Sequence, residues 1–262
     1  LLSARPINNV AAFDLTSHME FTAGASLAAS MRRKDLALPL DGTNARSVAL
    51  GRELATRHAG NPRAIVGELL TMFRQQPFVY TMQPPLLADN AVDEFLFDTR
   101  KGFCEHYASA FTVVMRAAGV PARVVTGYQG GEFNPFGGYL IVRQSDAHAW
   151  SEVWLEGRGW SRVDPTAAVA PERIQGSLID AVAEDEPVPG RLRDASPLWL
   201  QVELGWDAVN DIWNQRVVRF DAQSQFDLLE RLGVDDPDWR ALGLGLAGSL
   251  AVFFVLLSTY LA

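Results

Sequence analysis

The 262-residue chain has little sulfur and little positive charge. Cys104 is its one cysteine, so an intramolecular disulfide is excluded and the stability of the fold must come from packing. Lysine and arginine total 23 against 31 aspartates and glutamates, a net charge of -8, which argues against a nucleic-acid partner held through phosphate contacts. Because 48% of the residues are hydrophobic, the chain can still bury a sizeable core. We therefore expect a folded protein whose single thiol needs its own explanation.

Long apolar runs are also missing, with one exception at the C-terminus. Residues 241–262 carry no charge and are long enough to cross a bilayer core of roughly 30 Å, so a transmembrane helix is predicted. A buried core helix is the alternative, but a helix that is apolar all round would need protein on every side. Asp235, Asp236 and Asp238 precede the run, as is typical of a non-cytoplasmic flank. The chain begins at Leu1 without a signal peptide, so we expect a fragment of a longer protein.

The first half of the chain predicts helices. Apolar spacing indicates one helix over 44–58, and Asn61 followed by Pro62 is typical of the N-cap and first residue of the next, which should run to about 76. From Cys104 the apolar residues again follow helical spacing until Gly119. Cys104 is therefore expected in the first turn of a largely buried helix.

The residues after this helix predict strands. Strands are expected over 123–128 and 139–143, joined by a glycine-rich connection. The stretch DAHAWSEVWLEGRGWSRVDPT predicts two more strands, joined across Gly157-Arg158-Gly159. Helices first and an antiparallel sheet afterwards indicate the α+β class.

The remaining residues predict a linker and an amphipathic helix before the apolar run. Large apolar residues recur at helical spacing after residue 198, and we expect this stripe to pack against the core; it comprises Trp199, Val202, Trp206, Val209, Trp213 and Phe220. The predicted organisation is an N-terminal segment of uncertain structure, an α+β core, a linker, an amphipathic helical region and a transmembrane helix, with bounds 1–40, 41–175, 176–197, 198–240 and 241–262.

The position of Cys104 suits a nucleophile. A thiolate attacks more readily than a thiol, and the free backbone N–H groups at the start of a helix stabilise negative charge there. The same groups can hold the oxyanion that forms when sulfur attacks a carbonyl carbon. The alternative is that Cys104 is a small buried hydrophobic residue, the common fate of free cysteine. A suitable base must decide between the two.

Of the four histidines, His148 suits this role best. His106 lies two residues after the cysteine and should point away from it on a helix. His18 lies in a segment without clear structure, and His58 lies at a predicted helix end. His148 belongs to a predicted strand, and Asp164 follows on the returning strand, so the two can pair across the ladder. A structural histidine is the alternative interpretation.

The spacing of the predicted hairpin does not fit this pairing directly. For His148 to stand opposite Asp164 the turn must centre on Glu156, whereas the glycines come slightly later, at Gly157 and Gly159. We therefore expect a glycine bulge in the second strand. A histidine between a thiol and a carboxylate can deprotonate the thiol and later protonate a leaving amine.

Three motifs together resemble a known family. GFCEHYASAF, DAHAWSEVWL and GWSRVDPT, in this order, are similar to the transglutaminase-like superfamily, and most closely to its bacterial branch of membrane-anchored proteins with an extracytoplasmic core. The resemblance is strong over 93–173 and weaker over 44–85. It implies that Cys104 is the nucleophile, His148 the general base and acid, and Asp164 the residue that orients the imidazole. Trp150 would support His148 without touching substrate.

The resemblance also implies a fold, a reaction and a location. The fold is a papain-like core in which the helix bearing the cysteine packs on an antiparallel sheet. The reaction is acyl transfer through a thioester, from the glutamine side-chain amide of a protein or peptide, or from another amide. An amine acceptor such as lysine gives cross-linking, whereas water gives deamidation or proteolysis. The implied location is the inner membrane, held by the C-terminal span, with the core in the periplasm. No cofactor or metal is implied.

Other interpretations stay open at this stage. A cysteine peptidase or amidase would use the same triad, although Asp164 stands where papain-type enzymes usually have asparagine. A metal site built from Cys104, His106, Asp146 and His148 fits no common zinc spacing. An extracytoplasmic scaffold or binding domain that has lost its chemistry would not need all three triad residues. No residue upstream of Cys104 stands out as a second oxyanion donor.

Overall fold

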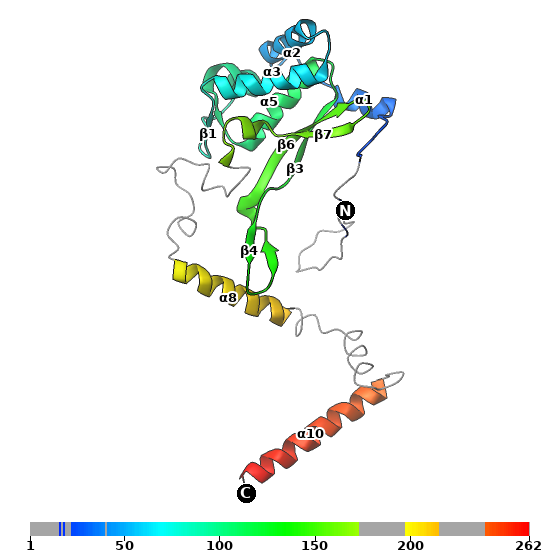
Figure 1. Cartoon of the computed structure of the whole chain (residues 1–262), viewed down its shortest axis with the longest axis vertical. Helices are drawn as coiled ribbons and strands as arrows, with labels where there is room; N and C mark the ends of the chain where they lie inside the picture. The colour runs from blue at the N-terminus through cyan, green and yellow to red at the C-terminus, as the bar shows by residue number, and fades with distance from the viewer. Residues whose placement is uncertain are drawn as a thin grey trace. The chain divides into compact units, whose positions relative to one another are not determined.

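The structure, a computed structural model, describes residues 16, 18, 22–39, 41–172, 197–214 and 239–261. The chain divides into two compact units (Figure 1), of which the first is Leu1–Glu132 with Val142–Arg193 and the second is Phe133–Ile141 with Asp194–Ala262. The predicted linker lies almost entirely outside the described residues, as does 215–238. The predicted domain boundaries stay a prediction.

The helices of the first unit form a layer against its sheet. They are α1 (Ala29–Asp35), α2 (Ala45–Arg57), α3 (Pro62–Gln75), α4 (Ala91–Asp93), the π-helix η1 (Glu94–Thr99) and α5 (Cys104–Ala117). Helix α5 contacts both α2 and the strands, so it is the central helix of the core. Its buried face contributes Tyr107, Phe111, Val114 and Met115, all without solvent exposure. Gly51 of α2 allows the close approach, because a Cβ atom there would lie 2.5 Å from the carbonyl oxygen of Val114.

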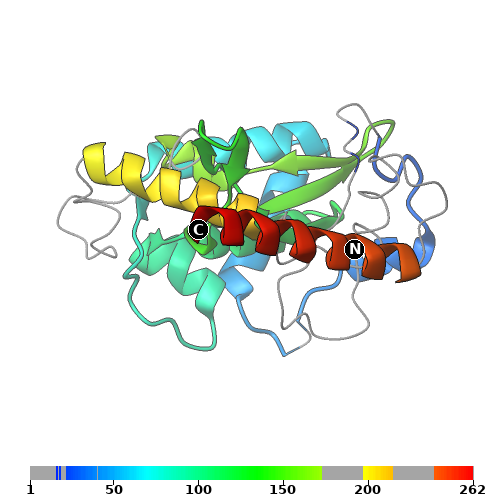
Figure 2. The same ribbon diagram turned by 90° about the horizontal axis from the view of Figure 1, so that it is seen from below.

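The main sheet is antiparallel and three-stranded, in the order β3-β6-β7. Its strands are β3 (Ala122–Tyr128), β6 (Ala147–Leu155) and β7 (Gly159–Val163), and β6 and β7 run side by side in both views (Figures 1 and 2). Just before α5, β1 (Val79–Tyr80) pairs in parallel with β2 (Lys101–Gly102). This short ladder ties down the chain that enters α5.

Several predictions from periodicity and capping are confirmed. The α+β class, the helices α2, α3 and α5, and the start of α5 at Cys104 are as expected. The Asn61 side chain accepts hydrogen bonds from the backbone N–H groups of Arg63 and Ala64, as an N-cap should. The strand expected over 139–143 is wrong in its partner: β5 (Tyr139–Ile141) pairs with β4 (Glu132–Asn134) and not with the main sheet. The glycine-rich connection itself contributes a strand, because Glu132–Asn134 pairs with β5 across its turn.

The second unit contains the helix that carries the tryptophan stripe. Helix α8 (Pro197–Trp213) holds the β4–β5 hairpin through Leu204 and Ala208, which are buried. The Asn134 side chain donates to the carbonyl oxygen of Leu204 at 2.9 Å, and the Tyr139 hydroxyl donates to Asp207 at 2.6 Å. The described part of the stripe is exposed; Trp199, Val202, Trp206, Val209 and Trp213 are 56–66% exposed. Phe220 lies outside the described residues, and the packing of the stripe against the core stays a prediction. The face of α8 that packs on the hairpin carries Leu204, Asp207 and Ala208.

The second unit also contains the C-terminal apolar helix. Helix α10 spans Trp239–Leu261, which confirms that the apolar run is helical. Within it, Gly243–Tyr260 is long and apolar enough to cross a membrane.

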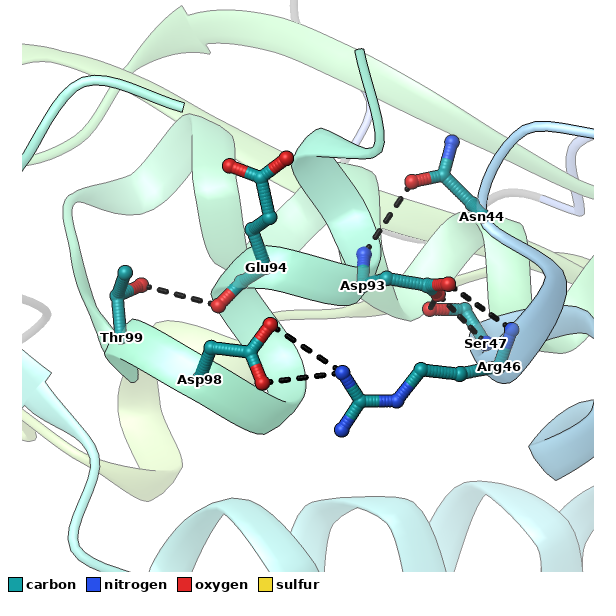
Figure 3. A network of polar contacts seen from close by, with 7 residues as sticks. All are labelled: Asn44, Arg46, Ser47, Asp93, Glu94, Asp98 and Thr99. Carbon is teal, nitrogen blue, oxygen red and sulfur yellow. Dashed lines mark hydrogen bonds and ion pairs between the residues drawn. The ribbon is translucent and has the colours of Figure 1, made fainter. Parts of the chain in front are cut away.

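A buried aspartate joins the start of α2 to the segment that leads into α5 (Figure 3). Asp93 is only 6% exposed, and its carboxylate accepts hydrogen bonds from the backbone N–H groups of Arg46 at 2.9 Å and Ser47 at 2.7 Å. The Ser47 hydroxyl donates to the same carboxylate. In return, the Asn44 side chain accepts from the backbone N–H of Asp93 at 3.2 Å. Asp93 therefore supplies the N-terminal cap that α2 lacks from its own N-cap side chain.

Replacing Asp93 with alanine should destabilise the first unit by about 1–3 kcal/mol, because buried N–H and hydroxyl donors lose their acceptor. Asp98→Ala is the control, since Asp98 is half-exposed and pairs with Arg46 at the surface, where a loss of about 0–1 kcal/mol is expected. Urea denaturation of both variants measures the difference. Equal losses would contradict the capping role of Asp93.

Candidate active site

Two buried hydroxyl groups tie α5 to β6. The Ser151 hydroxyl on β6 donates to the carbonyl oxygen of Ala108 on α5 at 3.0 Å. The Thr112 hydroxyl, also on α5, lies 3.0 Å from the same serine oxygen. Next to this contact, Cys104 packs against Ala108 and Ala149, whose small side chains let helix and strand approach closely. The thiol is thereby held against Ala149 of β6, the residue that follows His148.

Cys104 lies at the bottom of a pocket. The pocket has a volume of about 260 Å³, and its lining includes Cys104, His148, Thr126, Tyr80 and Met82. We call it the Cys104 pocket. The cysteine is 8% exposed and is the first residue of α5. The N–H groups of a first helical turn have no partner within the helix, so they are available to a negative charge at this position.

His148 is held between this thiol and a carboxylate. Its side chain has no solvent exposure, and its Nε2 atom lies 2.7 Å from Oδ2 of Asp164. With a carboxylate at Nε2, that nitrogen carries the proton, and Nδ1 presents its lone pair. Nδ1 is buried and makes no hydrogen bond of standard geometry with the described residues. The Cys104 thiol is nevertheless close enough to interact with the ring.

The environment of His148 raises its pKa. Burial by itself lowers the pKa of His148, but the hydrogen bond with Asp164 and the interactions with Cys104 and the aspartate charge raise it. The net direction of the pKa is upward from the ordinary histidine value. An imidazole with this environment accepts a proton from a neighbouring thiol more readily than one in water.

The carboxylate of Asp164 is itself fixed by the backbone. Asp164 is the N-cap of the short 3-10 helix η3 (Pro165–Ala168), and its Oδ1 atom accepts from the backbone N–H of Thr166 at 3.1 Å. Its Oδ2 atom meets His148 and, at 3.4 Å, the Arg162 guanidinium. Oδ1 thus fixes the carboxylate to the backbone, and Oδ2 accepts the hydrogen bond from the imidazole.

The hairpin register corrects the expected route to this contact. Ser151 stands opposite Val163 in a continuous ladder, and the turn centres on Gly157, which has a φ of 75°. Extending the ladder by one step puts Asp164 opposite Trp150, so the predicted bulge that would face it to His148 is wrong. Because residues two apart on a strand share a face, Asp164 reaches His148 diagonally.

Trp150 lies beside the histidine on β6. Its ring stacks on that of His148 with centroids 6.3 Å apart, and the Arg162 guanidinium lies 4.3 Å from its centre. On the neighbouring strand, Gly127 leaves room for it, because a Cβ atom there would lie 2.8 Å from the indole ring. Trp150 is thus packed on both faces and does not line the Cys104 pocket.

The other histidines lie away from the Cys104 pocket. His106 lines a different cavity, as its predicted direction requires, and its Nδ1 atom accepts from the backbone N–H of Phe103 at 3.4 Å. His58 pairs with Glu68, and His18 is exposed. Sequence reasoning missed the 3-10 turn η2 (Gln144–Asp146), whose Gln144 also lines the Cys104 pocket. A short turn has no hydrophobic periodicity, so the sequence does not show which of its side chains line a pocket.

Comparison with known proteins agrees with this arrangement. Residues 52–165 match the family model of the transglutaminase-like superfamily. The papain-like fold expected from the sequence, with the cysteine helix packed on an antiparallel sheet, is therefore confirmed.

Two bacterial proteins are similar to the chain. The chain is 45% identical to a protein-glutamine gamma-glutamyltransferase of Pseudomonas aeruginosa over 258 residues, which cover 95% of this chain and 38% of the relative. It thus spans about two fifths of the length of that relative. It is 42% identical to the uncharacterized protein YebA of Bacillus subtilis over 82 residues, which cover 30% of this chain and 11% of YebA.

Two solved structures are similar as well. The periplasmic domain of TgpA from Pseudomonas aeruginosa is 53% identical, with a TM-score of 0.58, over 60% of this chain and 54% of that one. The same domain bound to ethylmercury is 55% identical, with a TM-score of 0.56, over 57% of this chain and 53% of that one.

Replacing Asp164 with asparagine should remove a pH-dependent part of the stability. Because the folded-state pKa of His148 is raised, the stabilisation is fully present below the unfolded pKa of about 6.5 and is lost as the pH rises through the folded value. The stability lost in Asp164→Asn should therefore be larger at about pH 5.5 than at about pH 8.5. Urea denaturation across this range measures the loss.

Arg162→Gln is the matched control, because Arg162 contacts the same carboxylate oxygen of Asp164 at 3.4 Å. Its stability loss should change little with pH. A loss in Asp164→Asn that is equally flat with pH would contradict the assigned coupling between His148 and Asp164.

Proposed function

We propose that Cys104, His148 and Asp164 form a catalytic triad for cysteine-dependent acyl transfer from amides. The observation that carries the proposal is the buried imidazole of His148, which meets Asp164 at 2.7 Å through Nε2 and shares a pocket with the chain's one thiol. The domain's family and the name of its Pseudomonas relative, a protein-glutamine gamma-glutamyltransferase, agree with this chemistry. Trp150 acts as a positioning residue for His148.

The first half of the reaction forms a thioester. The Cys104 sulfur attacks the carbonyl carbon of the amide while its proton passes to Nδ1 of His148. The first-turn N–H groups of α5 stabilise the resulting oxyanion. His148 then returns the proton to the leaving nitrogen as the carbon–nitrogen bond breaks, so a glutamine amide leaves as ammonia. Asp164 stabilises the imidazolium throughout and keeps the proton on Nε2.

The second half regenerates the thiol. An amine or a water molecule attacks the thioester carbon, and its proton passes to Nδ1 of His148. The carbon–sulfur bond then breaks, and the proton returns to the Cys104 sulfur. An attacking lysine amine yields a cross-link between two polypeptides, whereas water yields a carboxylate. The same three residues serve both outcomes.

The shape of the pocket favours a side-chain amide as the donor. The Cys104 pocket has a volume of about 260 Å³, below the range of roughly 300–1,000 Å³ that is usual for ligand pockets. Cys104 itself is 8% exposed. A glutamine side chain carries its amide at the end of a thin, unbranched stem and can reach such a thiol. A main-chain amide would have to bring its flanking residues along. We therefore favour the side-chain amide of a protein or peptide glutamine as the acyl donor over a main-chain peptide bond.

We further infer that α10 anchors the protein in the inner membrane, with the domain on the periplasmic side. Support comes from the length and apolar character of Gly243–Tyr260 and from the periplasmic location of the related TgpA domain.

Cys104→Ala should abolish incorporation of a fluorescent primary amine into a glutamine-bearing protein, with a loss of about 10³-fold or more, because no other nucleophile can form the thioester. Asp98→Asn, a change at the surface ion pair with Arg46, should leave the rate unchanged. Gel fluorescence of the labelled acceptor measures both. Full incorporation by Cys104→Ala would refute the triad and favour a scaffold that has lost its chemistry.

The partition between amine and water is measured separately. We expect the wild-type chain to release ammonia and incorporate the amine in comparable amounts when the amine is in excess, since both follow from one thioester. A coupled ammonia assay run beside the incorporation assay gives the ratio. Ammonia release without incorporation would assign the chain to the amide hydrolases instead.

A further inference from the structure

A second cavity adjoins the Cys104 pocket. It has a volume of about 450 Å³ and lies between α5 and the chain that precedes η1. Its walls are mainly apolar and come from the loop 84–87, Val92 and Phe95, with His106 on the α5 side. We call it the flanking pocket. Glu105 lines both pockets, so one residue of the first turn of α5 separates them.

One loop forms part of both walls. Met82 lines the Cys104 pocket and is 39% exposed, while Leu86 lines the flanking pocket and is fully exposed. The two prolines between them, Pro84 and Pro85, have restricted φ angles and offer no N–H donors, so this wall is stiff and apolar before any ligand binds. Apolar side chains held open to water beside a reactive thiol suggest a surface that a substrate covers.

The polar groups of the flanking pocket are few and already ordered. His106 is half-buried, and its Nδ1 atom accepts from the backbone N–H of Phe103. Burial lowers the pKa of His106, so the ring stays neutral at physiological pH. Glu105 at the rim carries the negative charge nearest to both pockets. The cavity therefore suits an uncharged apolar group and disfavours an acidic one.

We propose that the flanking pocket binds a bulky apolar side chain of the polypeptide that donates the glutamine amide to Cys104. Because Glu105 lines both pockets, a polypeptide whose glutamine enters the Cys104 pocket can place a neighbouring side chain in the flanking pocket. An extended peptide advances about 3.3 Å per residue, and the pockets are separated by one residue of a helix, so the apolar residue lies within about three positions of the glutamine. This inference rests on the proposed acyl transfer, and it adds a preference for an apolar residue near the donor glutamine.

Binding to the inactive chain tests the pocket apart from the chemistry. Fluorescent peptides with one glutamine would be titrated onto full-length Cys104→Ala, with leucine, phenylalanine, serine or aspartate placed in turn at each of the neighbouring positions. We expect leucine or phenylalanine to bind about tenfold tighter than serine at one of these positions, and aspartate to bind most weakly. In the wild-type chain, kcat/KM for amine incorporation should show the same preference.

Leu86→Glu and Leu140→Glu form a matched pair of variants. Leu86 lines the flanking pocket and is fully exposed, whereas Leu140 on β5 is 55% exposed and lines neither pocket, so neither change disturbs the buried core. Leu86→Glu should reduce the preference for leucine over serine to about twofold or less, whereas Leu140→Glu should keep it near tenfold. Ser109→Phe, which fills the flanking pocket from α5, should have the same effect as Leu86→Glu.

The outcomes separate this proposal from the one before it. Efficient incorporation by the wild-type chain with equal rates for all peptides would overturn the flanking pocket and leave the acyl transfer standing. A leucine preference that survives in both Leu86→Glu and Ser109→Phe would also overturn it. Selective binding of apolar peptides by Cys104→Ala, without incorporation by the wild-type chain, would refute the acyl transfer and keep the pocket.

Discussion

The buried contact between His148 and Asp164 is the interaction on which the site depends. Burying a carboxylate and an imidazole without water is costly unless each finds a partner of good geometry. Here the carboxylate has one oxygen on the backbone of Thr166 and the other on the imidazole. That division keeps Nε2 protonated and leaves the lone pair of Nδ1 on the side of Cys104. Without the carboxylate, the ring would be free to take the other tautomer, and the thiol would lose its proton acceptor.

The fold meets this requirement by bringing together a helix and a hairpin from distant parts of the chain. Helix α5 carries Cys104, and the hairpin of β6 and β7 carries the histidine and leads into the aspartate. The hydroxyl contacts of Ser151 set the spacing between the two elements. Behind α5, the Asp93 cap of α2 and the β1–β2 ladder hold the chain that enters the helix (Figure 3). The Ser151 contacts therefore fix α5 against the hairpin, and the Asp93 network fixes the chain that precedes α5 against α2.

Much of this could be predicted from the sequence because local physics determines it. The helix at Cys104 and the Asn61-Pro62 start of α3 follow from periodicity and capping, which act within a few residues. The hairpin register was not predicted, because direct pairing of His148 with Asp164 requires a turn centred on Glu156. The turn centres on Gly157 instead, and the two side chains still share a face because they meet diagonally. The contact of α8 with the β4–β5 hairpin could not be predicted, because it depends on single polar residues, Asn134 and Tyr139, and not on the periodic apolar face. The flanking pocket gave no signal, since Pro84 and Pro85 indicate only a loop until α5 is placed beside them.

The central claim is that His148 activates Cys104, and the alkylation rate of the thiol tests it most directly. Because the chain has one cysteine, the uptake of iodoacetamide reports on that residue alone. At neutral pH we expect the wild-type thiol to react at least about tenfold faster than the thiol in His148→Gln, because the imidazole stabilises the thiolate. Equal rates in the two proteins would contradict the account, since the histidine would then have no influence on the sulfur beside it.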